Sequence, residues 1–179
     1  MAKGENLMLR KLISLAISIT TTVFAMHGTL SDNTYTSPRE RFTVEVPFTD
    51  LKVQDGDRAP GLGHDSATFT HTSNRGVGHR IEYIGAPFKS DSQFYARMTD
   101  NADAHGGSDA NSSVQSRERL SINGHAAYRV TMTGNHESGR ITVVATYLLT
   151  DDGMIATSSW APQGQDLLPE HDALLNSIG

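Results

Sequence analysis

Residues 115–133, with the sequence QSRERLSINGHAAYRVTMT, contain the clearest structural signal of the chain. Two runs with strand-like composition flank Asn123 and Gly124. Both residue types tolerate the positive φ angles of a two-residue turn, and Asn-Gly between two such runs is the strongest short signal for a hairpin. The stretch therefore predicts that residues 115–122 and 125–133 form two adjacent antiparallel strands.

A two-residue turn also predicts the register of this hairpin, because paired positions lie at equal distances from the turn. Glu118 falls opposite Arg129, where a cross-strand ion pair would contribute roughly 0.2–1 kcal/mol. Arg117 and Arg119 share the other face of the strand and fall opposite apolar or aromatic residues. This pairing requires either that their face is open to solvent or that the register contains a bulge.

Elsewhere in the chain, apolar residues alternate with polar ones in short runs, which is typical of strands with one buried face. Two further segments repeat apolar residues at helical spacing. The strands are expected at residues 42–46, 66–72, 79–84, 115–122, 125–133, 140–150 and 154–160, and the helices at residues 90–104 and 168–177. Residues 50–63 and 104–113 are rich in glycine and polar side chains and are expected to form surface loops.

Two segments locate the expected core. Residues 143–149 are apolar on both faces, so residues 140–150 should form the central and most buried strand. In the last helix, His171 shares one stripe with Leu174 and Leu175. The expected core comprises Phe42, Val44, Val46, Phe69, Ile81, Tyr83, Phe94, Met98, Tyr128, Val130, Val143, Ala145, Tyr147, Ile155, Leu174, Leu175 and Ile178.

The order of the elements predicts the fold class. Strands that outnumber two helices, with short turns between most of them, indicate an α+β domain in which a single antiparallel sheet of about six or seven strands is packed with helices. Residues 37–179 are expected to form this one domain, since a chain of this length encloses a single hydrophobic core.

The composition of residues 1–25 is typical of a secretory signal peptide. A basic head precedes an apolar run at residues 12–25, which is too short to span a bilayer. We expect export, cleavage after Ala25 and a location in the periplasm or outside the cell; a buried N-terminal helix or an uncleaved anchor is the alternative. Residues 26–36 are expected to be a flexible polar tether.

Charge and cysteine content exclude several function classes. The chain has a formal net charge of −5, which becomes −7 when three cations and one anion are lost with residues 1–25. An acidic chain is unsuited to nonspecific binding of nucleic acid or of anionic membranes. The chain contains no cysteine, so disulfides, thiolate metal sites, a cysteine nucleophile and a lipid anchor on cysteine are excluded. No stable membrane anchor is expected after cleavage.

No catalytic motif is present in the sequence. It has no G-x-S-x-G serine elbow, no phosphate-binding glycine loop and no H-E-x-x-H. Asp55 and Asp57 are similar to the start of a calcium loop, but no acidic residue closes that loop. The eight histidines lack metal-ligand spacing and are expected on the surface and at loop ends, with no metal and no cofactor. A clustering of His71, His79 and His125 in space stays open.

Four segments carry a resemblance to a known family: SPRERFTVEVP at residues 37–47, INGHAAYRV at residues 122–130, TYLLTDDGMI at residues 146–155 and LLNSI at residues 174–178. Together and in this order they resemble the PsbP-like family of small α/β/α sandwich proteins. The resemblance covers residues 37–179. It implies a sandwich fold and, since members mostly act as binding or assembly modules, a binding role without a catalytic motif.

Among the positively charged residues, arginine greatly outnumbers lysine, and this excess is the most informative feature of the charge composition. Residues 26–179 contain ten arginines and two lysines, and the guanidinium group suits planar, bidentate recognition of carboxylate or phosphate. The candidate binding residues are Arg75, His79, Arg80, Arg117 and Arg119. The loops at residues 50–63 and 104–113 are the segments expected to close over a ligand. The alternative is that these arginines are solvated positions at the edge of the sheet.

These observations predict an exported, non-catalytic binding or assembly protein of the bacterial envelope, whose partner is an envelope protein or a small anionic ligand. The alternative is a small periplasmic enzyme or metal-binding protein that uses a histidine/acid cluster. The two differ in whether titratable groups converge on one point. Convergence would favour the alternative if it involved three of His64, His71, His79, His125, Glu82 and Asp65.

Overall fold

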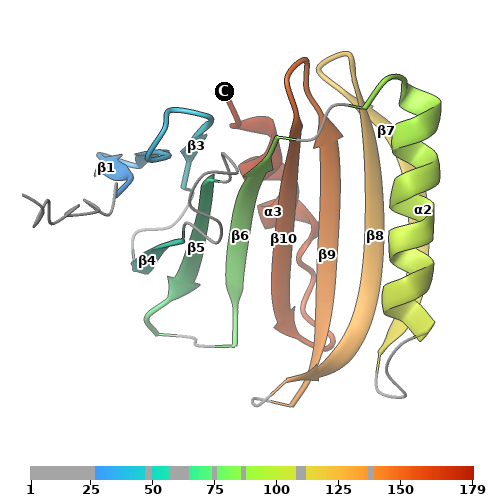
Figure 1. Ribbon diagram of the computed structural model, residues 1–179. Coiled ribbons are helices and arrows are strands. Elements are labelled where there is room, and N and C mark those ends of the chain that lie inside the picture. Colours follow the sequence, from blue (N-terminus) through green and yellow to red (C-terminus); the bar gives the residue numbers. More distant parts are fainter. Residues whose placement is uncertain are drawn as a thin grey trace, which may run out of the picture.

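The computed structural model describes residues 27–46, 50–56, 65–73, 76–85, 88–107, 112–136 and 139–179. Its main element is a seven-stranded sheet in the order β4-β5-β6-β10-β9-β8-β7, with every neighbouring pair antiparallel (Figure 1). The strands of this sheet are β4 Leu51–Gly56, β5 Asp65–His71, β6 Gly78–Ile84, β7 Ser113–Ile122, β8 His125–His136, β9 Gly139–Leu149 and β10 Met154–Pro162. A second sheet has the order β1-β2-β3, with β1 Thr29–Ser31, β2 Thr34–Thr36 and β3 Thr43–Glu45.

Two helices, α2 Asp91–Gly107 and α3 Leu168–Asn176, pack on opposite faces of the large sheet (Figure 1). Along β8, Ala127 belongs to a buried cluster with Leu174 of α3, whereas the next residue, Tyr128, packs with Phe94 and Met98 of α2. Successive side chains of a strand point to opposite faces, so the two helices cover opposite sides. The chain therefore has the expected α+β architecture of an α/β/α sandwich. Among the described residues, no helix is long and apolar enough to cross a membrane.

Side-chain capping explains where α2 begins. The hydroxyl of Ser90 accepts a hydrogen bond from the backbone N–H of Gln93 at 3.3 Å, as expected for an N-cap. The Gln93 side chain in turn accepts from the backbone N–H of Lys89 at 2.8 Å. The first of these bonds satisfies a backbone donor that the first turn of a helix leaves open, and the second ties the residue before the cap to that turn.

The hairpin between β7 and β8 has the predicted turn and register. Asn123 and Gly124 have φ angles of 53° and 85°, which a two-residue turn of this kind requires. Glu118 lies opposite Arg129, as expected. The register shifts between Val114 and Ser116, near the start of β7.

The expected ion pair within this hairpin does not form. Arg129 instead reaches across to Asp172 of α3 and pairs with that carboxylate, while Glu118 stays exposed on β7. The reason is that Arg129 lies on the face that α3 covers, where a partly buried carboxylate partner is within reach.

The segment at residues 26–36, expected to be a tether, contributes two strands and a core residue. Tyr35 in β2 is 1% exposed, and its ring packs edge-on against Phe69 with centroids 5.3 Å apart. Its hydroxyl donates to Asp55 Oδ1 at 2.6 Å. β1 and β2 thus lie before residue 37, so the described fold is not confined to residues 37–179. A single aromatic residue among polar neighbours gives no periodic signal, which explains the difference.

The expected loop at residues 50–63 contains the edge strand β4, which pairs with β5 along its whole length. Residues 57–63 lie outside the described residues. The sequence of β4, LKVQDG, carries the charged residues Lys52 and Asp55 beside apolar Leu51 and Val53, and charges are common on edge strands that must resist further pairing. The other expected loop, at residues 104–113, is shortened because α2 continues to Gly107 and β7 begins at Ser113; residues 108–111 are not among those described.

The central strand of the sheet is β10, so the expectation for residues 140–150 is wrong. β9 lies next to it, and its first residues, Gly139 and Arg140, are exposed. Of the expected core residues, Val143, Tyr147 and Ile178 are half-buried and the others are buried. Val143 and Tyr147 point to the face that carries α2, where the helix does not cover the whole sheet.

Candidate functional site

The uncovered part of this face contains a groove. α2 packs over β7, β8 and part of β9, and within the described part of the chain no helix lies in front of most of β6 and β10 on this face (Figure 1). The groove has a volume of about 250 Å³ and is lined by residues of β6, β9 and β10: Arg80, Glu82, Ile84, Ala145, Tyr147, Ala156, Thr157 and Ser158.

Arg80 is the charged anchor of this groove. One Nη of its guanidinium donates to Glu82 Oε2 at 3.1 Å, and both side chains are about one-fifth exposed. The Nε atom of Arg80 is buried and has no hydrogen-bond partner. A buried donor that is left unsatisfied costs roughly 1–3 kcal/mol, so an acceptor brought by a ligand would recover this energy.

Tyr147 adds a second donor to the groove. Burial, and secondarily the charge of Glu82, raise the pKa of the Tyr147 phenol above its ordinary value. The hydroxyl therefore remains protonated at any physiological pH. Ile84, Ala145 and Ala156 supply apolar surface beside these polar groups. Apolar walls with a few placed donors are typical of ligand sites.

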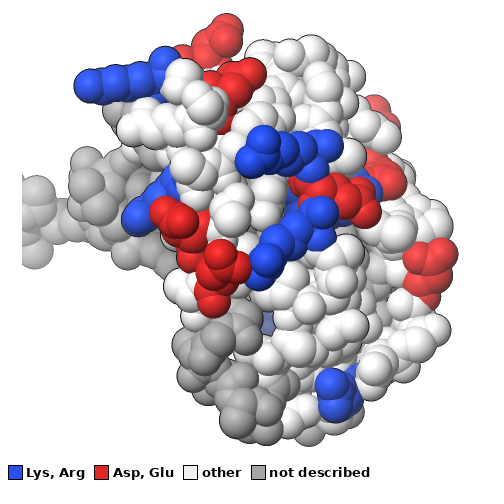
Figure 2. All heavy atoms as spheres, turned by 90° about the vertical axis from the view of Figure 1, so that its right-hand side faces the viewer, with Lys and Arg blue, Asp and Glu red and all other residues white. Residues whose placement is uncertain are grey.

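The other predicted arginines do not join this site. Arg117 pairs with Asp103 of α2 at 2.5 Å, and the guanidinium of Arg119 lies 4.9 Å from the centroid of the Tyr95 ring. Both contacts attach α2 to β7. Figure 2 shows that the cations near the centre of this side lie beside acidic side chains, that one cation at the lower edge stands alone, and that they form no continuous positive surface. Arg75 lies outside the described residues.

His79 lies on the opposite face of β6 from Arg80, so the predicted set does not form one surface. Its imidazole is fully buried and belongs to a chain of hydrogen bonds under α3. His79 Nδ1 and His171 Nδ1 each lie 2.8 Å from Ser159 Oγ, and His171 Nε2 lies 2.8 Å from Thr146 Oγ1. Arg129 Nε donates to the same Thr146 oxygen at 3.2 Å.

Both buried imidazoles are neutral in the folded protein. Burial lowers the pKa of His79 to about 4, helped by the nearby His71 and His171. Burial also lowers the pKa of His171 to about 4, with a further contribution from the charge of Arg129. The expectation that the histidines lie on the surface is therefore wrong for these two. The apolar stripe shared by His171 was the signal that could have placed it in the core.

His71 and His79 do approach each other, as left open, whereas His125 is exposed at the hairpin turn. Atoms of His71, His79 and Glu170 lie within 4.8 Å of one another. His71 Nδ1 lies 3.0 Å from Asp50 Oδ1, and hydrogen bonds from Ser73 and His71 lower the pKa of that carboxyl. Among the described residues, His71, His79 and Glu170 are the group whose side chains could share a metal ion.

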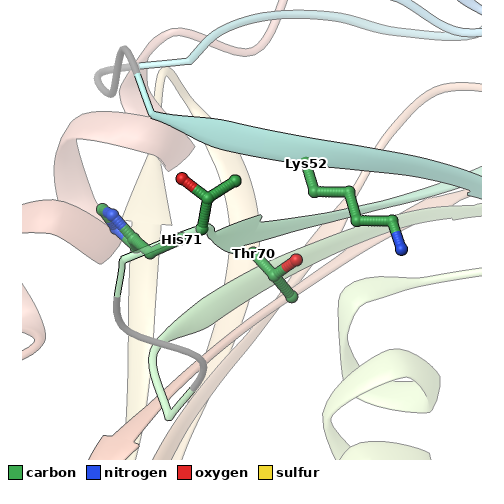
Figure 3. Close-up of a pocket in the computed structure, with 4 residues that line it drawn as sticks. Lys52, Thr70 and His71 are labelled. Atoms are coloured by element: carbon green, nitrogen blue, oxygen red, sulfur yellow. The ribbon is translucent and has the colours of Figure 1, made fainter.

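A second cavity of about 460 Å³ lies at the edge of the sheet and is lined by Lys52, Thr70, His71 and Thr72 (Figure 3). The imidazole of His71 points away from the Lys52 and Thr70 side chains, as alternation along β5 requires. The ammonium group of exposed Lys52 is mobile by nature, so this cavity offers fewer fixed polar groups than the groove around Arg80.

Comparison with known proteins relates the fold to solved structures only. No protein-family model matches the chain, and no curated protein matches it significantly in sequence. The solution structure of cyanobacterial PsbP (CyanoP) from Synechocystis sp. PCC 6803 is similar, with a TM-score of 0.59 and 14% identity over 82% of this chain and 90% of that one.

A crystal structure from Bacteroides thetaiotaomicron also has a TM-score of 0.59, with 13% identity over 84% of this chain; the match spans 48% of that longer chain, about half. The Ran-binding protein Mog1p of Saccharomyces cerevisiae matches with a TM-score of 0.47 and 9% identity over 79% of this chain and 90% of its own, which is too weak to support an argument. These similarities show a shared fold and do not extend to function.

Proposed function

We propose that this protein is a non-catalytic binding protein that takes an anionic group, a carboxylate or a phosphate, into the groove between β6, β9 and β10. The observation that carries the proposal is that Arg80 lines this groove and that its buried Nε has no hydrogen-bond partner. Nε and an adjacent Nη form one edge of the guanidinium fork, the geometry that suits two oxygens of one anion.

Glu82 shapes the specificity of this groove. The Glu82 carboxylate lies 3.1 Å from the Arg80 guanidinium and offsets its positive charge. The groove therefore exerts little long-range attraction on anions in general. A ligand must therefore bring apolar surface for Ile84, Ala145 and Ala156 as well as an acceptor. A small carboxylate with an apolar body, or an acidic side chain of an envelope protein, fits this chemistry.

A hydrolytic enzyme is the second class of function, and the buried Ser159 speaks against it. Ser159 lies between two imidazoles, as a serine nucleophile would, but its side chain is fully buried under α3. A nucleophile must reach a substrate carbonyl. Within the described part of the groove, no histidine lies beside Ser158 or Tyr147.

The proposal extends to membership in the PsbP-like family and to an exported location. Similarity of fold to CyanoP supports membership in the PsbP-like family, together with the segments at residues 37–47 and 122–130. Residues 1–26 lie outside the described residues, and the composition of residues 1–25 supports export with cleavage. Mass spectrometry of the exported chain should find an N-terminus at Met26; exported protein that retains Met1 would contradict cleavage.

Replacement of Arg80 by lysine tests the groove directly. Arg80→Lys keeps the positive charge but removes Nε, so we expect affinity for a carboxylate ligand to fall by about tenfold or more, because a charge-assisted hydrogen bond contributes roughly 1.5–3 kcal/mol. The probes are hexanoate, succinate and inorganic phosphate. The measurement is the shift of the backbone amide resonances of the residues that line the groove, followed by ¹H–¹⁵N NMR during titration of the wild type and of the variant.

The matched control is the double variant Arg117→Ala/Arg119→Ala, which removes two arginines outside the groove. It should bind the same probe with unchanged affinity. In pull-downs from an envelope extract, a partner that uses the groove should be lost with Arg80→Lys and kept with the control. Loss in the control alone would place binding on β7 and overturn the proposal.

A further inference from the structure

Three ligand-type side chains converge at one end of the large sheet, and each comes from a different element. His71 ends β5, His79 is the second residue of β6 and Glu170 lies in the first turn of α3. Their ligand atoms lie within 4.8 Å of one another, and His79 Nε2 is 3.7 Å from Glu170 Oε2. Four ligand atoms around a tetrahedral Zn²⁺ at about 2.0–2.1 Å lie roughly 3.3 Å apart, so small movements would complete the geometry.

One carboxylate oxygen of Glu170 is unsatisfied at this point. Its Oε2 is buried and accepts no hydrogen bond. His79 Nε2 lies 3.7 Å from this oxygen, which is beyond hydrogen-bond distance. A buried carboxylate oxygen in this position is costly unless a cation or a donor compensates it.

Both imidazoles are held from behind by an oxygen. His71 Nδ1 contacts the carboxylate of Asp50 at 3.0 Å, and His79 Nδ1 contacts the hydroxyl of Ser159 at 2.8 Å. In metal sites the ligating histidine commonly engages its other ring nitrogen in this way, which orients the ring. The Ser159 hydroxyl can donate or accept, so it permits the tautomer of His79 that would bind a cation through Nε2.

We propose that His71, His79 and Glu170 form a binding site for a divalent transition-metal ion of the zinc type. Two imidazole nitrogens and one carboxylate oxygen suit Zn²⁺ and its neighbours, whereas Ca²⁺ and Mg²⁺ require oxygen ligands. The side chains of His71 and Glu170 are 17% and 40% exposed, which gives an ion access from solvent while His79 closes the buried side. Three protein ligands leave a further position for water or for a ligand of the ion.

Zinc binding by the chain tests this site without any assay of activity. The chain is purified without a histidine tag, stripped with EDTA and titrated with Zn²⁺ by calorimetry, and with Co²⁺ by visible absorption. We expect one equivalent of Zn²⁺ to bind, a tetrahedral Co²⁺ spectrum, and a rise in melting temperature because the ion joins α3 to β5 and β6. Ca²⁺ and Mg²⁺ should have no effect.

The variants are chosen at partly exposed positions so that the fold survives. Glu170→Gln and His71→Gln each remove one ligand atom and should weaken zinc binding by more than about tenfold; Asp50→Asn, behind His71, should weaken it by about tenfold. His125→Gln, at the exposed hairpin turn, is the matched control and should bind zinc as the wild type does. Arg80→Lys should also leave zinc binding unchanged, which separates this site from the groove.

Two results would overturn the proposal. One is that the stripped chain takes up no zinc at micromolar concentration. The other is that Glu170→Gln and His71→Gln, with unchanged circular dichroism, bind zinc as tightly as the wild type, which would place the ion at other histidines.

Discussion

Acidification from pH 7 to pH 4 is expected to destabilise the protein strongly, with the loss concentrated between pH 6.5 and pH 4. The folded state keeps His79 and His171 neutral down to about pH 4, whereas the ordinary histidine pKa is 6.5. Below pH 6.5 the unfolded chain therefore takes up protons that the folded chain does not, and the free energy of unfolding falls. Each histidine contributes at most roughly 3 kcal/mol to this loss.

Urea unfolding followed by circular dichroism at several pH values between 7 and 4, with EDTA present, measures this effect. His171→Gln should reduce the dependence on pH by about half, because one of the two buried imidazoles is then absent. His125→Gln replaces an exposed imidazole and should leave the slope as it is. A free energy of unfolding that stays level from pH 6.5 to pH 4.5 would show that the two buried histidines accept protons in the folded state.

The fold was predictable where local chemistry decides it. Asn123 and Gly124 can adopt the φ angles of a two-residue turn, so the turn and the register of the β7–β8 hairpin followed from the sequence. The same holds for the start of α2, where Ser90 caps the helix. Short edge elements were missed because β2 and β4 carry polar side chains, and their apolar contribution rests on isolated residues such as Tyr35.

The candidate sites were harder to predict because they depend on contacts between distant segments. Arg80 was a binding candidate from the sequence and lines the groove, but nothing local indicated that α2 would leave that groove uncovered. Arg117 and Arg119 have the same chemistry and instead hold a helix. Glu170 was not considered as a ligand, because it lies 91 and 99 positions from His79 and His71 and only the packing of α3 brings it there.

The two faces of the large sheet therefore carry different candidate sites. On the α2 face, incomplete cover leaves a groove with a buried guanidinium nitrogen. On the α3 face, a single short helix brings Glu170, His171 and Asp172 onto three different strands. His171 and Asp172 find their polar partners only if the helix is docked. The docking itself must come from apolar packing, since the helix has nine residues and would not be stable alone.

Leu174→Ala is expected to lower the free energy of unfolding by about 2–5 kcal/mol, the range for a leucine truncated in a well-packed core. Leu174 is fully buried and packs with the cluster that includes Phe69, Ile81 and Ile155. Its loss leaves a cavity under α3 and loosens the contacts that this helix makes with the sheet. Urea unfolding at pH 7 measures the change.

Leu168→Ala in the same helix is the matched control, because Leu168 is 42% exposed and should cost little. The two variants have the same chemistry and differ in burial, so their difference isolates the docking of α3 from its helix propensity. A loss below about 0.5 kcal/mol for Leu174→Ala would mean that α3 is peripheral. The buried histidines beneath it and the proposed metal site would then lose their physical basis together, since both require α3 to be held against β6 and β10.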